Sequence, residues 1–214
     1  MSIDTGLLRQ YLVLGSAFLY WTGVIVQAYR LRRHIGRSPN IRPRGLREKF
    51  LWAGWLLVIA GWIGQPLIIR HCACGTLFSL IRFLFHPLGI FLGILLALCG
   101  HIGTLWCYSA LGDSWRIGIN KGERTTLVTN GPYGLVRHPI YLFQMMILIG
   151  MLFFLPTLFS FVILLIHFTC TIIKASDEEA YLMAIHGIAY RVYLSGTGRL
   201  FPNWKSVRRI FCRT

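Results

Sequence analysis

Two short segments of the chain hold most of the residues that can take part in chemistry. The first, TTLVTNGPYGLVRHPIY, ends with Arg137 and His138 close together, and the second, KASDEEAYL, contains Glu178 and Glu179. Charged groups of both signs, with tyrosines and apolar residues around them, suit a ligand that carries an amine, a carboxylate and an aromatic base. The segments therefore predict a small-molecule site, next to which a second, apolar ligand would bind.

Arg137 and His138 lie at the predicted start of a helix. Asn130-Gly131-Pro132 indicates a turn, and Pro139 suits the first helical turn, where the missing N–H of proline costs nothing. The unpaired N–H groups at a helix start carry partial positive charge. Together with the two basic side chains, they predict an anion-binding position.

Long apolar runs surround these segments. They cover residues 10–29, 50–69, 83–112 and 138–173, each about twenty residues or more, the length needed to cross a bilayer. The last run, at 36 residues, would form a helix of about 54 Å, which suits two short spans with a turn at Pro156. We predict a single-domain, all-α integral membrane protein over residues 1–214, with five transmembrane helices, the last two forming a helical hairpin.

The predicted hairpin returns the chain to the face of the membrane from which it started. Segments 111–141 and 174–202 should therefore meet there, and they contain five of the seven acidic residues. We expect an amphipathic helix to begin at Lys174 and to complete the site, with Asp177 stabilising the N-terminus of that helix.

The net charge of +15 reflects membrane topology rather than nucleic-acid binding. Eight of the 22 Lys and Arg residues lie in 30–49, and most others lie in 116–137 or 174–213. A five-span chain places all three regions on one side, which the positive-inside rule makes cytoplasmic. We expect the N-terminus outside, the C-terminus and site in the cytoplasm, and no nucleic-acid partner.

The six cysteines are scattered and indicate no disulfide framework. His71-Cys72-x-Cys74 lacks a second ligand pair at a suitable spacing, so we predict no metal site.

The two segments carry a resemblance. TLVTNGPYGLVRHPIY and DEEAYLMAIHGIAYRVYLSGTGRLFP resemble the signature blocks of the integral-membrane methyltransferases, typified by isoprenylcysteine carboxyl methyltransferase and the phospholipid methyltransferases. The likeness is concentrated in about the last ninety residues. It implies S-adenosylmethionine as cofactor and methyl transfer to a lipophilic acceptor from the bilayer, with a carboxylate, thiol or amine as the nucleophile.

The resemblance also implies roles for individual residues. Arg137 and Glu179 would orient groups around the transferred methyl, and Lys174 stands where relatives tend to have an arginine that approaches the substrate. Glu178 would bind the amine of the cofactor. The rest of the cofactor would contact Thr125, Thr126, Leu127, Val128, Tyr133, His138, Pro139, Ile140 and Tyr141.

Two departures from the family pattern bear on the acceptor. Phe143 stands where relatives usually have a small residue, and we expect it to narrow an opening toward the lipid. Lysine at position 174 removes the bidentate carboxylate recognition that an arginine offers.

Two other functions remain open. A membrane reductase of the sterol or 3-oxo-steroid type shares a similar tail and binds a nicotinamide cofactor, but such proteins commonly have asparagine where this chain has Ile140. The other alternative is a non-catalytic membrane scaffold.

Several further polar residues receive structural interpretations. His101 and His167 lie within predicted spans and are interpreted as packing histidines, and Arg199 as a residue that closes a loop. Tyr190 and Tyr193 fit either a membrane-interface position or the site.

Overall fold

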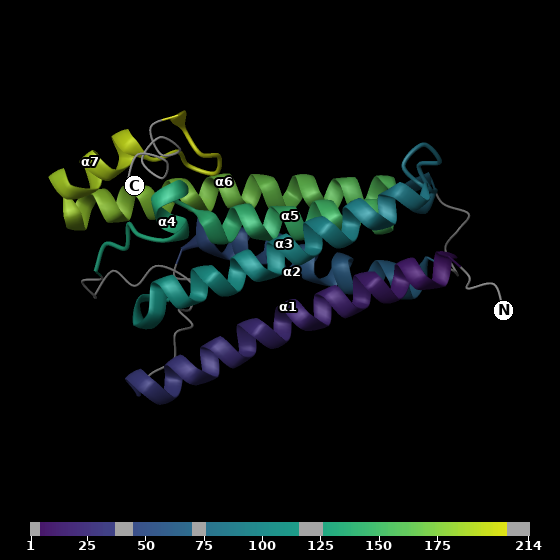
Figure 1. Cartoon of the computed structure of the whole chain (residues 1–214), viewed down its shortest axis with the longest axis horizontal. Coiled ribbons are helices and arrows are strands. Elements are labelled where there is room, and N and C mark those ends of the chain that lie inside the picture. Colours follow the sequence, from purple (N-terminus) through teal and green to yellow (C-terminus); the bar gives the residue numbers. More distant parts are fainter. Residues whose placement is uncertain (1–4, 37–44, 70–75, 116–125, 205–214) are drawn as a thin grey trace, which may run out of the picture.

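The computed structural model describes residues 5–36, 45–69, 76–115 and 126–204, and this part of the chain is helical, with no named strand. Five longer helices run side by side (Figure 1): α1 (Thr5–Ile35), α2 (Leu46–Ile68), α3 (Pro87–Leu111), α5 (Pro139–Phe154) and α6 (Leu158–His186). The shorter elements are η1 (Thr76–Phe78), η2 (Gly112–Ser114), α4 (Pro132–Leu135) and α7 (Ile188–Gly196). In Figure 1, α4 and α7 lie at one end of the bundle, opposite the N-terminus.

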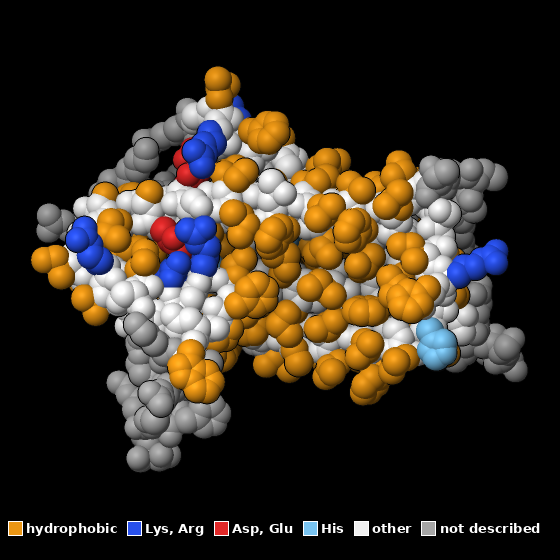
Figure 2. Space-filling model, turned by 90° about the horizontal axis from the view of Figure 1, so that it is seen from above, with side chains coloured by type: hydrophobic (Ala, Val, Ile, Leu, Met, Phe, Trp, Pro, Cys, Tyr) orange, Lys and Arg blue, Asp and Glu red, His pale blue; other side chains and the backbone are white. Residues whose placement is uncertain are grey.

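The surface of the bundle suits a lipid environment. Figure 2 shows hydrophobic side chains covering its middle, with Lys, Arg, Asp and Glu side chains toward the ends. Helices α1, α2, α3 and α6 are each long and apolar enough to cross a membrane. The all-α prediction is thus confirmed over the described residues, and these four helices are compatible with an integral membrane protein. Helix α5 is apolar but has 16 residues, about 24 Å, which is less than a typical bilayer core. The predicted count of five spans is therefore not confirmed.

Helices α5 and α6 form the predicted hairpin, with Pro156 between them. Thr157 caps α6, because its side chain accepts a hydrogen bond from the backbone N–H of Ser160 at 3.0 Å. The Gln65 side chain donates to the Thr157 hydroxyl at 2.6 Å. The turn is therefore fixed both by its own cap and by a polar contact from α2.

Small residues bring α3 and α5 into close contact. A Cβ added at Gly100 would overlap the Ile147 side chain, and one added at Gly103 would overlap the ring of Phe143. The close approach is typical of helix pairs in membranes, where packing rather than the hydrophobic effect holds helices together.

The C-terminal part of α6 differs from our prediction. No new helix begins at Lys174. Helix α6 runs without a break to His186, because no Gly or Pro interrupts it before Gly187, which has a φ of 50° and separates it from α7. Asp177 therefore lies in the middle of a helix, not at an N-terminus, and it forms an ion pair with Arg47 of α2 at 2.9 Å.

At the opposite end, Arg9 joins α1 to α3 and α5. The side chain is buried and donates hydrogen bonds to the carbonyl oxygens of Phe153 and Phe154, at 2.9 and 3.2 Å, and of His86, at 2.8 Å. The guanidinium thus satisfies carbonyl groups at the C-terminus of α5, which have no partner within the helix.

Candidate functional site

The backbone brings the two chemistry-bearing segments together at one end of the bundle. Val136 forms an isolated parallel bridge with Gly198. The N–H groups of Arg137 and His138 donate to the carbonyl oxygens of Gly198 and Arg199, at 2.8 and 3.1 Å. The start of α5 is therefore tied to the segment that follows α7.

Glu179 forms the charged centre of this end of the molecule. Its buried carboxylate accepts hydrogen bonds from Arg137 Nε at 2.9 Å and from Arg199 Nε and Nη2 at 3.1 and 2.6 Å. His138 Nε2 lies 3.2 Å from the same carboxylate. Arg199, which we had interpreted as a loop-closing residue, is thus a direct partner of Glu179.

Glu178, the neighbouring acid, contacts a different set of side chains. The Tyr141 hydroxyl donates to Glu178 Oε1 at 2.8 Å, and His138 Nδ1 lies 3.4 Å from Glu178 Oε2. His138 therefore faces one carboxylate with each ring nitrogen. Only a protonated imidazole donates from both nitrogens, so this arrangement favours the charged form.

The surroundings of His138 and Arg199 shift their protonation equilibria. Burial opposes the charge on His138, but hydrogen bonds and the charges of Glu178 and Glu179 outweigh burial and raise its pKa above the ordinary value of 6.5. Hydrogen bonds to Glu179 likewise raise the pKa of Arg199.

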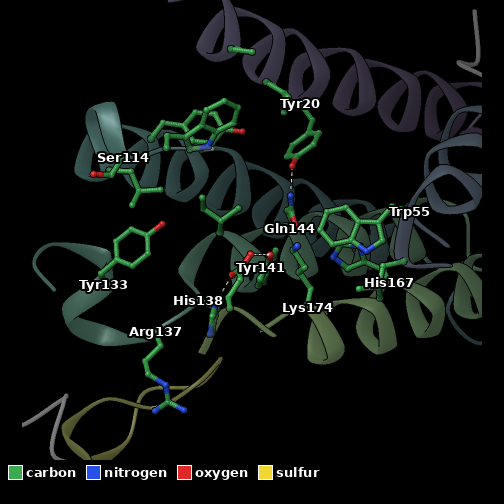
Figure 3. A pocket seen from close by; sticks show the side chains of 18 of the residues that line it. Tyr20, Trp55, Ser114, Tyr133, Arg137, His138, Tyr141, Gln144, His167 and Lys174 are labelled. Atoms are coloured by element: carbon green, nitrogen blue, oxygen red, sulfur yellow. Dashed lines mark hydrogen bonds and ion pairs between the residues drawn. The ribbon is translucent and has the colours of Figure 1, made fainter. Parts of the chain in front are cut away.

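A cavity of about 600 Å³ opens beside these charged residues, a size typical of small-molecule sites. In the view of Figure 3, Tyr133 and Arg137 lie on one side, Trp55 and His167 on the other, and Lys174 and Gln144 between them. Most of the residues implied by the resemblance line the cavity: Thr126, Leu127, Val128, Tyr133, Arg137, His138, Ile140, Tyr141, Lys174 and Glu178.

The rest of the cavity lies between the helices and is mostly apolar. Four tryptophans from α1 and α2 contribute to its wall: Trp21, Trp52, Trp55 and Trp62. Val58, Ile147 and Leu148 also line it. One continuous space therefore joins a charged end to an apolar interior.

Two of the described residues implied by the resemblance do not line the cavity. Pro139 begins α5, and Glu179 lies behind Arg137 and His138 rather than at the surface of the cavity. Thr125 lies outside the described residues, as do His71, Cys72 and Cys74.

Three aromatic residues near the site, Phe143, Tyr190 and Tyr193, can now be placed relative to the cavity. Phe143 does not line the cavity; its ring fills the space between α5 and Gly103, so it narrows no opening there. Tyr190 and Tyr193 are buried and line the cavity, which decides against membrane-interface positions. The Tyr193 hydroxyl donates to the carbonyl oxygen of Tyr133 at 2.7 Å.

The two histidines within spans differ from each other. His101 Nε2 lies 2.9 Å from the Ser16 hydroxyl, in keeping with the packing role that we predicted. His167 lines the cavity, and its Nε2 has no hydrogen-bond partner. No sequence pattern distinguishes the two, because both lie on long apolar helices.

Comparison with known proteins supports the resemblance. Residues 88–188 match the family model described as phospholipid methyltransferase. This match covers just under half of the chain and agrees with the resemblance drawn from the two segments. The matched region extends from α3 through α6 and includes His138, Glu178 and Glu179, but it ends before Arg199.

A shorter likeness exists to a curated protein. A stretch of 65 residues is 35% identical to the cobalt-zinc-cadmium resistance protein CzcN of Cupriavidus metallidurans. The stretch covers 30% of this chain and 26% of that protein, so the chain matches about a quarter of the relative's length.

Proposed function

We propose that the protein transfers a methyl group from S-adenosylmethionine to a lipophilic acceptor at the cytoplasmic face of a membrane. One observation carries the proposal: Glu178, Arg137, Lys174 and a long apolar interior line a single cavity. The charged end suits an amino acid-like cofactor, and the apolar end suits a lipid-like acceptor. The methyltransferase family match supports the same chemistry.

The residues at the charged end fit the cofactor. Glu178 presents a carboxylate that binds an ammonium group, and Arg137 and Lys174 offer positive charge to a carboxylate. Residues 126–128 line the cavity without regular secondary structure, and in this proposal their backbone groups bind the edge of the adenine ring. Tyr133 and Tyr141 add aromatic surface beside them.

When bound, S-adenosylmethionine supplies a methyl group on a positively charged sulfur; the nucleophile bonds to the methyl carbon while the carbon–sulfur bond breaks and leaves its electron pair on sulfur. The chain contributes alignment and the exclusion of water. In this proposal Lys174, which lines the cavity, binds an anionic acceptor group, such as a carboxylate or thiolate. The apolar walls bind the remainder of the acceptor.

Glu179 is a positioning residue in this proposal. It does not line the cavity, but its carboxylate accepts a hydrogen bond from Arg137 and contacts His138, two residues that do. Arg199 anchors the carboxylate from the other side. Glu179 and Arg199 therefore hold the side chains of Arg137 and His138 in fixed positions at the cavity.

The distribution of charge supports the proposed orientation. Arg32, Arg33 and His34 lie in the last turn of α1, and Arg47 pairs with Asp177 near the site, whereas Arg9 contacts the opposite end of α5. The site is then cytoplasmic and the N-terminus lies outside. In this arrangement α5 serves as a short fifth crossing.

The experiment measures the affinity of S-adenosylhomocysteine for the purified protein by isothermal titration, with Glu178→Gln as the test and Asp177→Asn as the matched control. Both substitutions remove one charge from neighbouring positions of α6, but Asp177 pairs with Arg47 instead of lining the cavity. We expect Glu178→Gln to weaken binding about 10- to 100-fold, as the loss of a charge-assisted hydrogen bond does, and Asp177→Asn to bind normally. Equal affinity in both variants would refute the assignment.

A further inference from the structure

The loop that follows α7, residues 197–204, carries two exposed aromatic side chains at the same end of the molecule as the site. Phe201 is 73% exposed and Trp204 is 75% exposed. No residue of this loop lines the cavity, so the two rings have no part in binding its ligand. Exposed apolar surface of this kind marks contact with a partner or with a membrane.

The loop is held in place by its own turn and by contacts with the rest of the chain. A Cβ added at Gly198 would overlap the carbonyl group of Phe201, so the chain turns tightly there. Leu200 is buried, and the carbonyl oxygens of residues 198 and 199 accept hydrogen bonds from the start of α5. The two exposed rings therefore have a defined position on the surface.

Contacts with α6 give the depth of the loop relative to a membrane. Arg199 donates to Ser176 at 3.3 Å and to Glu179 at 2.6 Å. The uncharged run of α6 ends at Ile173, so these two partners lie about 5 and 9 Å beyond it along the helix axis. The headgroup layer on each side of the hydrocarbon core is about 5–8 Å thick. The loop therefore lies at the level of the lipid headgroups.

The start of α7 lies farther from the membrane than the loop does. Helix α6 continues to His186, about 20 Å beyond Ile173, and α7 begins two residues later with Ile188, which is 81% exposed. In Figure 1 the yellow loop turns back from α7 toward the middle of the bundle. The chain thus has exposed apolar side chains at two different depths.

The sequence after the loop is strongly basic. The ten residues that follow Trp204 contain no Asp or Glu and four basic residues, Lys205, Arg208, Arg209 and Arg213. Tryptophan is enriched at the membrane–water interface. Each basic residue beside an anionic membrane strengthens binding about fivefold. The depth of the rings and this charge together favour an anionic membrane surface over a soluble partner.

We infer that the loop anchors this end of the protein to an anionic membrane surface. The rings of Phe201 and Trp204 insert among the lipid headgroups, and the basic sequence after them supplies the attraction to lipid phosphates. The same loop holds Arg199 against Glu179 and pairs with the start of α5. Anionic lipid therefore stabilises the charged end of the cavity, whichever ligand the cavity binds.

The first measurement tests whether Trp204 meets lipid. The protein is placed in nanodiscs of phosphatidylcholine and phosphatidylglycerol, with and without phospholipid brominated near the top of its acyl chains. Bromine quenches the fluorescence of a tryptophan that it contacts. Trp204→Phe keeps an apolar ring, so the emission that it lacks is the emission of Trp204. We expect brominated lipid to remove most of that emission.

The second measurement tests whether anionic lipid holds the loop. Hydrogen–deuterium exchange of residues 197–204 is compared in nanodiscs of phosphatidylcholine alone and of equal amounts of phosphatidylcholine and phosphatidylglycerol. We expect exchange to be at least about fivefold slower with the anionic lipid, and high salt should abolish the difference because it screens charge. The difference should disappear in Phe201→Ser/Trp204→Ser but persist in Ile188→Ser, the matched control at the start of α7.

Several results would overturn the inference. Emission of Trp204 that brominated lipid leaves unchanged would show that the ring lies in water. Equal exchange in the two kinds of nanodisc, or an equal effect of Ile188→Ser, would exclude an anionic membrane as the partner of this loop. Slowing that appears in detergent as the protein concentration rises would indicate a second copy of the chain instead. The lipid and salt comparisons use the unmodified protein, so they decide the question even where a variant fails to fold.

Discussion

The substitution Glu179→Gln tests whether the buried carboxylate holds the site together. Glutamine keeps the shape of the side chain but removes the charge that Arg137, Arg199 and His138 contact. The Arg137 side chain is only 10% exposed, so it cannot recover this loss by turning to water. Its remaining partners are the carbonyl oxygens of Leu194 and Thr197.

The size of the effect follows from the burial of each partner. Removing one member of a fully buried ion pair costs about 3–5 kcal/mol. The Arg199 side chain is 38% exposed, so solvent screens part of its interaction. We therefore expect the free energy of local unfolding at this end of the molecule to fall by about 2–3 kcal/mol. This corresponds to about a 30- to 160-fold increase in the equilibrium constant for local opening.

The loss of stability should be confined to the region around α7. Glu179 and its partners lie where the start of α5 is joined to the chain that follows α7. Hydrogen–deuterium exchange in detergent should show amides of α7 exchanging about 30- to 160-fold faster in Glu179→Gln, while amides in the middle of α5 remain unchanged. Asp177→Asn serves as the control. Unchanged exchange in α7, or equal acceleration in both helices, would refute the reasoning.

Three further substitutions follow from the packing and the charges. Phe143→Ala should lower the free energy of unfolding by about 3 kcal/mol, because it leaves a cavity beside Gly103. Thermal melting should show this loss of stability. A weakened affinity for S-adenosylhomocysteine would contradict our placement of the Phe143 ring outside the cofactor cavity. Arg9→Met should lower the free energy of unfolding by roughly 3 kcal/mol, since it leaves the carbonyl oxygens of Phe153 and Phe154 without a donor. The exposed Arg82→Met is the melting control, and an equal effect in both variants would count against these hydrogen bonds as the cause. His138 has a raised pKa, so its ion pairs stabilise the fold fully below pH 6.5, and that contribution is lost as pH rises through the higher folded-state pKa. The melting temperature should fall over that range in the unmodified protein but not in His138→Gln, and identical pH profiles would exclude the ion pairs as its cause.

The sequence was sufficient to predict the hairpin and the meeting of its flanking segments. The length of the uncharged run and Pro156 determine both, because a hairpin must return residue 174 to the side of residue 137. The helix start at Pro139 was likewise evident from local chemistry. These features depend on residues close together in sequence or on simple length limits.

Other features depend on contacts that no local pattern contains. The end of the uncharged run at Ile173 marks the end of apolar sequence, not the end of a helix, so we misplaced a helix start and the role of Asp177. The pairing of Arg199 with Glu179 and the turning of Phe143 toward α3 depend on how the segments pack in three dimensions. The different surroundings of His101 and His167 have the same origin.

The central claim is that this cavity binds S-adenosylmethionine rather than a nicotinamide cofactor. Isothermal titration of the purified protein with S-adenosylhomocysteine and, separately, with NADPH tests it most directly. We predict saturable binding of S-adenosylhomocysteine and none of NADPH. Binding of NADPH alone would contradict the account and indicate a reductase.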